Sequence, residues 1–414
     1  MTVRSIAFVT PWPPNVMGIG ETCYTLVKRL AEISPWHFSI YTNALNPIQI
    51  PGVTIHTLPL DAQGFVDVAA TLPSLRRHDL VVHQMGNSSL HAFQWPLLDA
   101  LPSVCHFHDL VYYHFWCWYY FDFIKKPDVF FSELSRFYPD LKPIFEKSLI
   151  NTPLWYRIKW KWLRIWNQTD LNSYPLFEPH VEKSIGCIVH SEHSKDKIQK
   201  AFPARVVYKI PLHKGEFSLC SQDTVSKELH FGIFGSIMPN KQVDLIFKTF
   251  AILAKEFPNW KITLVGPIAE SCQPLYALAK KLGIENKVTF LGKVEKDVYL
   301  HQLNQIDCCI NLRLPSYGES SGVVTECLIL GIPVLVINHM WYRELPTFFD
   351  KLDPRDLPNQ LLSTLRSYFL YPEKLAQKKA LSKEYSDQRF SYLQWAKNYL
   401  NILEEFCLLQ GNLK

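Results

Sequence analysis

The sequence predicts an α/β protein built from two doubly wound domains, each with a parallel sheet. Short apolar runs suited to buried parallel strands alternate with segments of helical period, and this alternation occurs twice. A polar stretch without clear period, residues 214–227, separates the two sets. The chain has 414 residues, more than one core usually organises. We therefore expect an N-terminal domain over 1–215, a C-terminal domain over 228–391 and a final helix over 392–414.

Each expected strand is a run of Val, Ile, Leu, Phe or Cys bounded by polar or turn residues. The first domain carries these runs at 6–9, 38–41, 53–58, 80–83, 104–107, 187–189 and 206–210. The second carries them at 231–234, 262–265, 288–290, 308–311 and 333–337. The helices between them have one apolar face, as in the first helix, where such residues recur every three or four positions: Cys23, Leu26, Val27, Leu30.

Composition excludes several classes of protein. The net charge of +5 arises from 43 basic and 38 acidic residues, too small an excess for a nucleic-acid binder. The ten cysteines form no CxxC pair, so they suggest neither a zinc site nor a disulfide framework. No run of eighteen apolar residues occurs. We expect a cytoplasmic protein, at most peripheral at the inner face of the cytoplasmic membrane.

An aromatic and basic insertion, residues 111–166, interrupts the alternation in the first domain. Its clearest part has an apolar helical stripe beside a basic face without acidic residues. One interpretation is an amphipathic helix that caps the domain. The other, equally open, is a patch for a membrane surface or anionic acceptor, because Trp suits the headgroup zone and Arg or Lys suits anionic lipid. The residues of this patch would be Trp155, Arg157, Lys161, Trp162 and Arg164.

Three loops at strand ends carry candidate ligand-binding residues. In the first, residues 11–21, Gly18 and Gly20 would let a ligand approach the N–H groups of a helix N-terminus, although a structural turn fits as well. The loop lacks the third glycine of a dinucleotide fingerprint. In the second, residues 235–241, Gly235 follows a strand and Lys241 offers an ammonium group suited to a diphosphate.

The third loop and the helix after it, residues 311–326, form the densest constellation. Small residues would expose N–H donors and hydroxyls at a helix start, and Glu326 one turn further in could accept from sugar or ribose hydroxyls. Such a loop at the carboxyl end of parallel strands is where open α/β sheets bind ligands. The candidate residues are Arg313, Gly318, Glu319, Ser320, Ser321, Gly322 and Glu326.

The run GESSGVVTECLILGIPV resembles the donor loop and helix of retaining GT-B glycosyltransferases, a family with two Rossmann-like domains facing a central cleft. The resemblance implies that Glu326 binds the donor ribose and that Lys241 holds the diphosphate. The family's Glu-x7-Glu spacing places Gly318 where its first glutamate stands, so Glu319 is displaced by one position. The family's diphosphate arginine has no counterpart at Ser236 or Ile237, and Arg313 is its expected replacement.

Other segments of the first half resemble the family's acceptor domain. HFHDLVYYH matches its His-Asp segment at a strand end, which implies that His108 and Asp109 lie at the cleft. HQMGNSSLH and IVHSEHSKDKI match segments at neighbouring strand ends. The catalytic candidates are therefore His108, Asp109, Lys241 and Glu319, and no metal or cofactor is expected.

The resemblance implies a metal-independent, retaining hexosyltransferase that uses a UDP- or GDP-linked sugar and a glycan or lipid-linked acceptor. Such an enzyme would act in polysaccharide, lipopolysaccharide or glycolipid biosynthesis. One alternative is an inactive module that binds nucleotide sugars, favoured by the displaced Glu319 and the absent arginine. An epimerase or phosphorylase of the same fold is a second alternative, and a dinucleotide-dependent oxidoreductase fits least.

Overall fold

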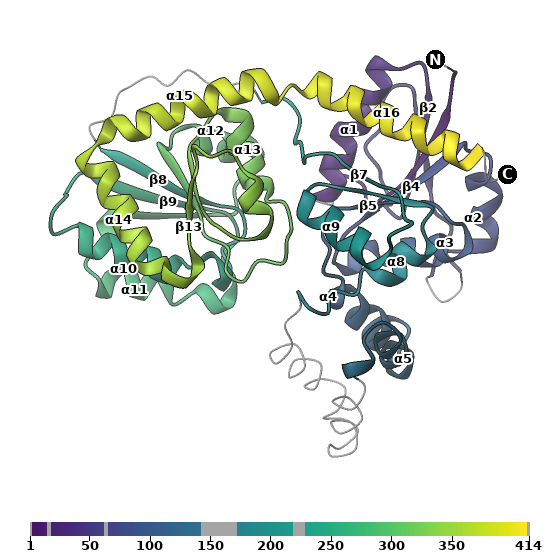
Figure 1. Ribbon diagram of the computed structural model, residues 1–414, viewed down its shortest axis with the longest axis horizontal. Helices are drawn as coiled ribbons and strands as arrows, with labels where there is room; N and C mark the ends of the chain where they lie inside the picture. The colour runs from purple at the N-terminus through teal and green to yellow at the C-terminus, as the bar shows by residue number, and fades with distance from the viewer. Residues whose placement is uncertain (1, 15–17, 62–64, 142–171, 218–227, 412–414) are drawn as a thin grey trace. The chain divides into compact units, whose positions relative to one another are not determined.

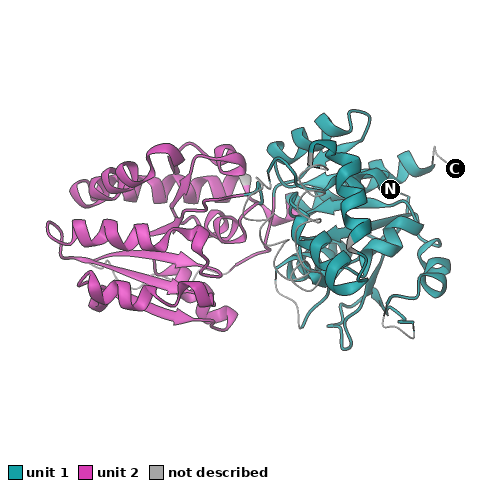
Figure 2. Ribbon diagram, turned by 90° about the horizontal axis from the view of Figure 1, so that it is seen from below, with its two compact units in different colours: residues 1–211, 317–319, 395–414 teal, residues 212–316, 320–394 magenta. Residues whose placement is uncertain are grey.

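The computed structural model describes residues 2–14, 18–61, 65–141, 172–217 and 228–411. It divides into two compact units, each described by itself below. The first comprises residues 1–211, 317–319 and 395–414, and the second comprises 212–316 and 320–394 (Figure 2). The basic patch expected at Trp155, Arg157, Lys161, Trp162 and Arg164 lies outside the described residues, as does most of the expected linker.

The first unit contains a parallel sheet of seven strands in the order β3-β2-β1-β4-β5-β6-β7. Ile6 at its centre pairs with Phe38 on one side and Leu80 on the other. Strand order reverses between β1 and β4, which makes their carboxyl ends a topological switch point. The strands are β1 (Ser5–Val9), β2 (His37–Thr42), β3 (Val53–Thr57), β4 (Leu80–Met85), β5 (Val104–Phe107), β6 (Gly186–Val189) and β7 (Val207–Lys209).

The helices of this unit include the last one of the chain. Trp395 of α16 donates its indole N–H to the Pro211 carbonyl at 2.7 Å, and Glu404 pairs with Arg4 at 2.8 Å. Figure 1 shows α16 beside the first sheet, although the chain reaches it only at its end. The remaining helices are α1 (Ile19–Ile33), α2 (Val68–Leu75), η1 (Ser89–His91), α3 (Gln94–Ala100), α8 (Glu178–Lys183) and α9 (Glu192–Ala201), and α16 spans Tyr392–Gly411.

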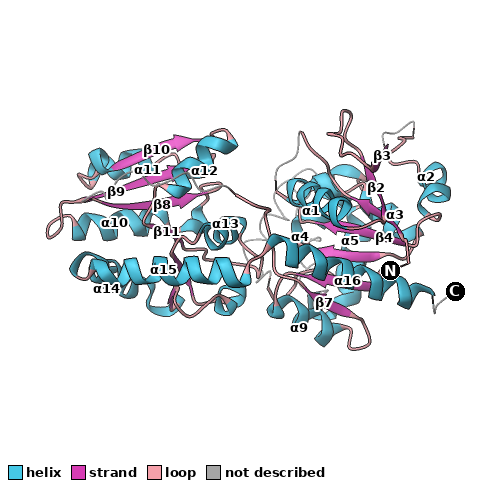
Figure 3. Cartoon of the chain, turned by 90° about the horizontal axis from the view of Figure 1, so that it is seen from above, coloured by secondary structure: helices cyan, strands magenta, loops and turns pink. Residues whose placement is uncertain are grey.

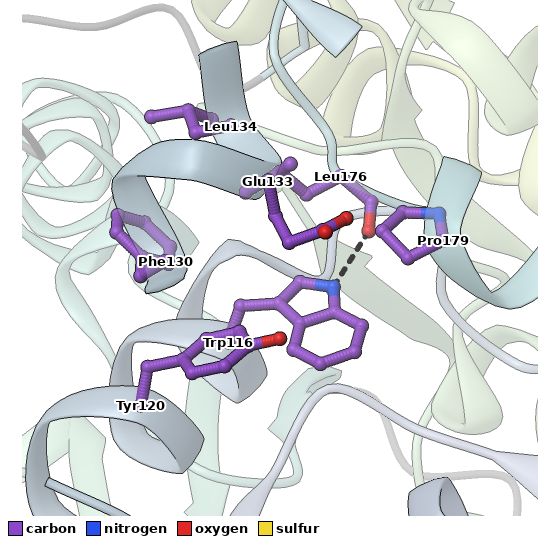
Figure 4. Close-up of a pocket in the computed structure, with 7 residues that line it drawn as sticks. All are labelled: Trp116, Tyr120, Phe130, Glu133, Leu134, Leu176 and Pro179. Atoms are coloured by element: carbon purple, nitrogen blue, oxygen red, sulfur yellow. Dashed lines mark hydrogen bonds between the residues drawn. The ribbon is translucent and has the colours of Figure 1, made fainter. Parts of the chain in front are cut away.

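The described part of the aromatic insertion forms a small helical layer on the first unit. It contains α4 (Tyr113–Cys117), the π-helix η2 (Trp118–Phe123), α5 (Pro127–Phe137) and η3 (Pro139–Leu141). The Trp116 indole donates to the Leu176 carbonyl at 2.9 Å beside a cavity of about 10 Å³ (Figure 4). This volume holds about one water molecule, so the aromatic residues that line it, Trp116, Tyr120 and Phe130, pack a core rather than form a sugar site.

The second unit contains a parallel sheet of six strands in the order β10-β9-β8-β11-β12-β13. The sequence analysis missed its edge strand β13, because two of its three residues are charged and only Leu352 is buried. The strands are β8 (Leu229–Phe234), β9 (Trp260–Val265), β10 (Val288–Gly292), β11 (Cys308–Asn311), β12 (Val334–Ile337) and β13 (Asp350–Leu352).

Helices cover both faces of the second sheet (Figure 3). Both units thus have a parallel sheet between helical layers, and the fold predicted from the sequence, two Rossmann-like α/β domains, is confirmed. The longer helices are α10 (Val243–Leu253), α11 (Leu275–Lys281), α12 (Lys296–Asn304), α13 (Gly322–Leu330), α14 (Leu357–Leu370) and α15 (Pro372–Arg389). The short helical turns are η4 (Pro239–Lys241), η5 (Glu270–Cys272), η6 (Glu285–Lys287), η7 (Met340–Glu344) and η8 (Pro354–Asp356).

Candidate functional site

The switch point of the second sheet brings two of the predicted loops together. Strand order reverses between β8 and β11, and the carboxyl ends of adjacent parallel strands lie at one edge. The Leu314 N–H donates to the Asn240 carbonyl at 2.8 Å, and the Gln242 amide donates to the Leu314 carbonyl at 2.7 Å. These bonds fix the loop after β11 against the turn η4 that follows β8.

Lys241 is buried at this junction, with only 3% of its surface exposed. Its ammonium group donates to the Phe234 carbonyl at the end of β8. Burial and, to a smaller extent, the neighbouring Arg313 guanidinium lower the Lys241 pKa to about 7, while Glu326 opposes the shift. Two adjacent cationic side chains, one of them buried, would be stabilised by an anion.

Gly235 leaves the room that the Lys241 side chain occupies. It has φ +76°, and a Cβ there would lie 3.4 Å from the Lys241 Nζ atom and 3.1 Å from Val323 Cγ2. Glycine adopts this conformation at little cost, whereas other residues are strained in it. The predicted role of Gly235 therefore has a specific steric basis.

The N-terminus of α13 lies on the same loop. Ser321 caps the helix by accepting the Val324 N–H at 3.4 Å, and the Ser320 hydroxyl is buried beside it. The position of a Cβ on Gly322 lies 4.0 Å from the Lys214 ammonium. The positive end of the helix dipole and the Lys214 ammonium group thus lie close together at the N-terminus of α13. Lys214 was not singled out from the sequence, because it lies in a polar stretch without periodicity.

Glu326 lies within α13 and is held by a residue of α12. The Tyr299 hydroxyl donates to Glu326 Oε2 at 2.7 Å. Burial and the Glu326 carboxylate raise the Tyr299 pKa well above its ordinary value, so the phenol stays a donor at neutral pH. Sequence spacing could not reveal this pair, because its members belong to separate helices.

Gly318 and Glu319 are grouped with the first unit, apart from the residues just described. Glu319 Oε2 accepts the Tyr317 N–H at 2.7 Å, which closes a tight turn around Gly318, whose φ is +88°. The Glu319 carboxylate thus has a local structural partner. The structure brings together seven of the predicted donor residues in the second unit, namely Gly235, Lys241, Arg313, Ser320, Ser321, Gly322 and Glu326.

In the first unit the predicted glycines open α1. Gly18 is the N-terminal capping position, with φ +80°, and its carbonyl accepts the Thr22 N–H at 3.0 Å. Gly20 is buried in the first turn of the helix. Because α1 follows β1 at the switch point, both glycines lie at the ligand-binding edge that such sheets use.

His108 and Asp109 follow β5 at the same edge. Asp109 Oδ2 accepts the Asn87 N–H at 3.2 Å. His108 Nε2 lies 2.8 Å from Gln84 Oε1, and His108 Nδ1 lies 3.0 Å from His190 Nε2. Both ring nitrogens of His108 therefore have partners inside the unit, and His190 and Gln84 are neighbours that the sequence analysis had not proposed.

Part of the chain is similar to a known family of enzymes. Residues 221–347 match the family described as Glycosyl transferases group 1. This match agrees with the resemblance to glycosyltransferases found from the sequence. An uncharacterized glycosyltransferase of Haemophilus influenzae is 31% identical over 105 residues, which are 25% of this chain. The match spans only 28% of that curated relative.

Solved glycosyltransferase structures show the same two-domain fold, known as GT-B. HepE from Anabaena, in complex with UDP and glucose, has a TM-score of 0.63 at 15% identity, covering 97% of this chain and 100% of its own. Sucrose-phosphate synthase from Thermosynechococcus elongatus gives 0.63 at 14% identity, covering 97% and 99%. WaaG, a glycosyltransferase involved in lipopolysaccharide biosynthesis, gives 0.61 at 15% identity, covering 96% and 99%. At these identities the likeness concerns the fold alone.

No helix in the described part of the chain is both long enough and apolar enough to cross a membrane.

Proposed function

We propose that the chain is a retaining glycosyltransferase that transfers a hexose from a nucleoside diphosphate sugar to a glycan or lipid-linked acceptor. The observation that carries this proposal is the buried Lys241 beside Arg313, close to the N-terminus of α13 in a group 1 glycosyl transferase segment. These groups fit a diphosphate, and Glu326, held by Tyr299, is suited to ribose hydroxyls.

The same groups would assist departure of the nucleoside diphosphate. Negative charge grows on its oxygens as the glycosidic bond breaks, and preorganised cations stabilise that charge. Lys241, Arg313 and the α13 N-terminus supply positive charge at the place where other enzymes use a metal ion, so we propose a metal-independent transfer. UDP is the favoured nucleotide, because HepE structures with UDP and UDP-glucose share the fold.

We assign the acceptor proton to the leaving diphosphate rather than to a fixed carboxylate. The Glu319 carboxylate accepts the Tyr317 N–H, which supports a turn rather than a nucleophile. Such a front-side route retains the anomeric configuration. Asp109, Gly18 and Gly20 remain the residues proposed to face the substrates from the first unit, and His108 is reconsidered below.

A cavity of about 210 Å³ in the first unit supports an acceptor with an apolar or sugar-ring face. It lies beside residues that follow β2, β3 and β4, at the carboxyl edge of the sheet. The Trp118 and Phe123 rings stack with centroids 5.0 Å apart, and Phe65 meets Phe123 edge-on at 4.5 Å. Aromatic faces bind both sugar rings and apolar chains.

For localisation, we propose that the enzyme meets its acceptor at the cytoplasmic face of the membrane. WaaG, which shares the fold, is involved in lipopolysaccharide biosynthesis. The test is cosedimentation with anionic vesicles of a variant carrying Arg157→Glu, Lys161→Glu and Arg164→Glu. Reduced sedimentation is expected, and unchanged sedimentation would exclude this patch as the membrane contact.

Donor binding and turnover are separable in one set of experiments. Thermal unfolding is followed with UDP, GDP and their sugars on the wild type, Lys241→Met, Glu326→Gln and the exposed control Lys248→Met. Stabilisation by one nucleotide family, lost in the first two variants only, is expected. The anomer released by slow donor hydrolysis, followed by proton NMR, then tests retention. Binding without any turnover of donor, with all acceptors tried, would favour the inactive binding module.

A further inference from the structure

Three histidines of the first unit converge beside the carboxyl ends of β5 and β6. His106 and His108 are two residues apart, so their side chains leave β5 on the same side. His190 directly follows β6, which pairs in parallel with β5. One ring nitrogen from each histidine can be chosen so that all three lie within 4.8 Å of one another. His106 is 1% exposed and His190 is 5% exposed.

The nitrogens on the outer side of this cluster are held by oxygen atoms. The Ile210 carbonyl, which can only accept, lies 3.0 Å from His190 Nδ1, so this nitrogen carries the proton. Gln84 Oε1 lies 2.8 Å from His108 Nε2, and the Gln84 amide nitrogen is directed to the Tyr399 hydroxyl at 3.4 Å. With the Gln84 amide in this orientation, His108 also donates on its outer side. The Tyr399 hydroxyl lies 3.0 Å from His106 Nδ1.

With these proton positions, the inner nitrogens of His190 and His108 present lone pairs to each other. His190 Nε2 and His108 Nδ1 are 3.0 Å apart, and neither neutral ring has a proton left for the other. The buried His106 Nε2 has no hydrogen-bond partner among the described residues. Facing lone pairs in a buried site repel unless a cation lies between them. The arrangement is that of metal-bound histidines, whose outer N–H groups are held by carbonyl, amide or hydroxyl oxygens.

We propose that His106, His108 and His190 bind a divalent transition-metal ion, with Zn²⁺ as the best fit. Imidazole is a favoured zinc ligand, and two nitrogens bound at about 2.0–2.1 Å in a tetrahedral site lie roughly 3.3 Å apart. The observed 3.0 Å between His190 and His108 is close to that spacing, and the three nitrogens together lie within 4.8 Å of one another. Two such bonds span at most about 4.1 Å, so binding would draw the His106 ring inward. Three protein ligands leave a fourth position for a solvent or ligand donor.

A shared proton is the competing occupant of the gap, and burial opposes it. His106 is 1% exposed and His190 is 5% exposed, so the extra positive charge of a shared proton would be buried away from water, which costs free energy. A metal ion would also bring positive charge into the buried site, but its bonds to three nitrogens would compensate for the free energy of removing that charge from water. The site lies wholly within the first unit and is independent of the proposed donor site in the second.

The proposal changes the role of one predicted catalytic residue. His108 would use Nδ1 for the ion and Nε2 for Gln84, so it would position the adjacent Asp109 rather than touch a substrate. It also departs from the expectation of a chain without metal. That expectation rested on the chemistry of the donor site and on the scattered cysteines, whereas these histidines meet only through the pairing of β5 with β6.

The test uses the full chain after dialysis against a chelator, titrated with Zn²⁺ by calorimetry and with Co²⁺ by visible absorption. One ion per chain is expected, with the intense Co²⁺ absorption of a four-coordinate nitrogen site that Zn²⁺ then displaces. Absence of that absorption, with no heat of Zn²⁺ binding, would overturn the proposal and favour the shared proton. Neither readout depends on nucleotide binding or transfer, so a failure here is distinct from a failure of the proposed function.

Variants locate the ion. His190→Ala should weaken Zn²⁺ binding at least 100-fold, whereas His37→Ala, which removes an exposed histidine of the same unit, should leave it within twofold. Tyr399→Phe retains all three ligands and removes only the hydroxyl beside His106, so a loss of roughly tenfold is expected. If His190→Ala fails to fold, Tyr399→Phe still decides. Unchanged affinity in both folded variants would place any bound ion elsewhere and refute the site.

Discussion

The Tyr299 hydroxyl, on α12, donates a 2.7 Å hydrogen bond to the Glu326 carboxylate on α13. Burial and, after it, the Glu326 carboxylate raise the Tyr299 pKa and so keep the phenol protonated. One carboxylate oxygen of Glu326 is thereby held in place. In the proposed donor site this leaves the carboxylate oriented for ribose hydroxyls before the nucleotide arrives.

Replacing Tyr299 by Phe should therefore weaken UDP binding by roughly tenfold, because a hydrogen bond to a charged group contributes about 1.5–3 kcal/mol and Glu326 itself remains. Calorimetry with UDP and 2′-deoxy-UDP measures the effect. The loss should be smaller for the deoxy nucleotide, which offers Glu326 one hydroxyl fewer. Tyr276→Phe, at a position 46% exposed on α11, is the matched control. Equal losses for both nucleotides would contradict a role at the ribose.

Much of the fold could be predicted because buried parallel strands have continuous apolar sequences. Runs such as 104–107 and 308–311 were placed at their observed bounds. Strand β13 could not be found in this way, since its sequence Asp-Lys-Leu offers one apolar residue. The sequence predicted a helix at 392–414 but not that Trp395 and the residues after it group with the first unit. That placement depends on contacts far apart in the chain, such as Arg4 with Glu404.

The candidate site was predictable where glycine, lysine and serine stand at strand ends. Gly235, Lys241 and Ser321 have roles that follow from this local context. Hydrogen-bond partners that come from other helices or strands could not be recognised in the sequence, as with Tyr299, which donates to Glu326. The approach of His190 to His106 and His108 was beyond reach for the same reason, because strand pairing alone brings His190 to His108.

The Lys241 pKa predicts how nucleotide binding depends on pH. In the free protein the pKa is lowered to about 7 by burial and by Arg313, with Glu326 opposing. A bound diphosphate stabilises the ammonium form and raises the pKa, so binding between pH 7 and 9 should take up a proton. UDP affinity should therefore fall as pH rises above 7, by up to roughly tenfold per unit. Calorimetry in buffers of different ionisation enthalpy measures the proton directly.

Lys241→Met is the control for this pH dependence. It keeps an unbranched side chain in the buried site and removes the titrating group. Binding should be weaker at every pH, and the proton uptake should disappear. Proton uptake that persists in this variant would assign it to another group.

A methyl group at Gly235 should disturb nucleotide binding more than stability. Gly235→Ala imposes a positive φ on alanine, at a cost of about 1–2 kcal/mol, and places Cβ 3.4 Å from the Lys241 ammonium. Gly283→Ala has the same backbone cost at φ +70°, but nothing lies within 4 Å of its Cβ. Gly235→Ala should lose more thermal stability than Gly283→Ala, because its Cβ also lies 3.1 Å from Val323 Cγ2, and only Gly235→Ala should lose UDP affinity. Equal UDP affinities in the two would show that Gly235 serves the turn alone.

The anchoring of α16 can be tested at Phe406. Its fully buried ring meets Tyr208 edge-on at 5.1 Å and fills the space beside Gly186, where a Cβ would lie 2.3 Å from it. Phe406→Ala removes this packing and should cost about 3–5 kcal/mol in urea unfolding. Leu408→Ala, at a position 55% exposed, should change the free energy of unfolding by less than about 0.5 kcal/mol.

The same variant separates the two units, because Phe406 and Gly186 belong to the first and the proposed donor residues Lys241 and Glu326 to the second. Phe406→Ala should therefore retain UDP binding under conditions in which the first unit is still folded. The measurement is UDP calorimetry below the unfolding transition, beside circular dichroism of the same sample. A stability indistinguishable from that of Leu408→Ala would mean that α16 does not contribute to the core of the first unit.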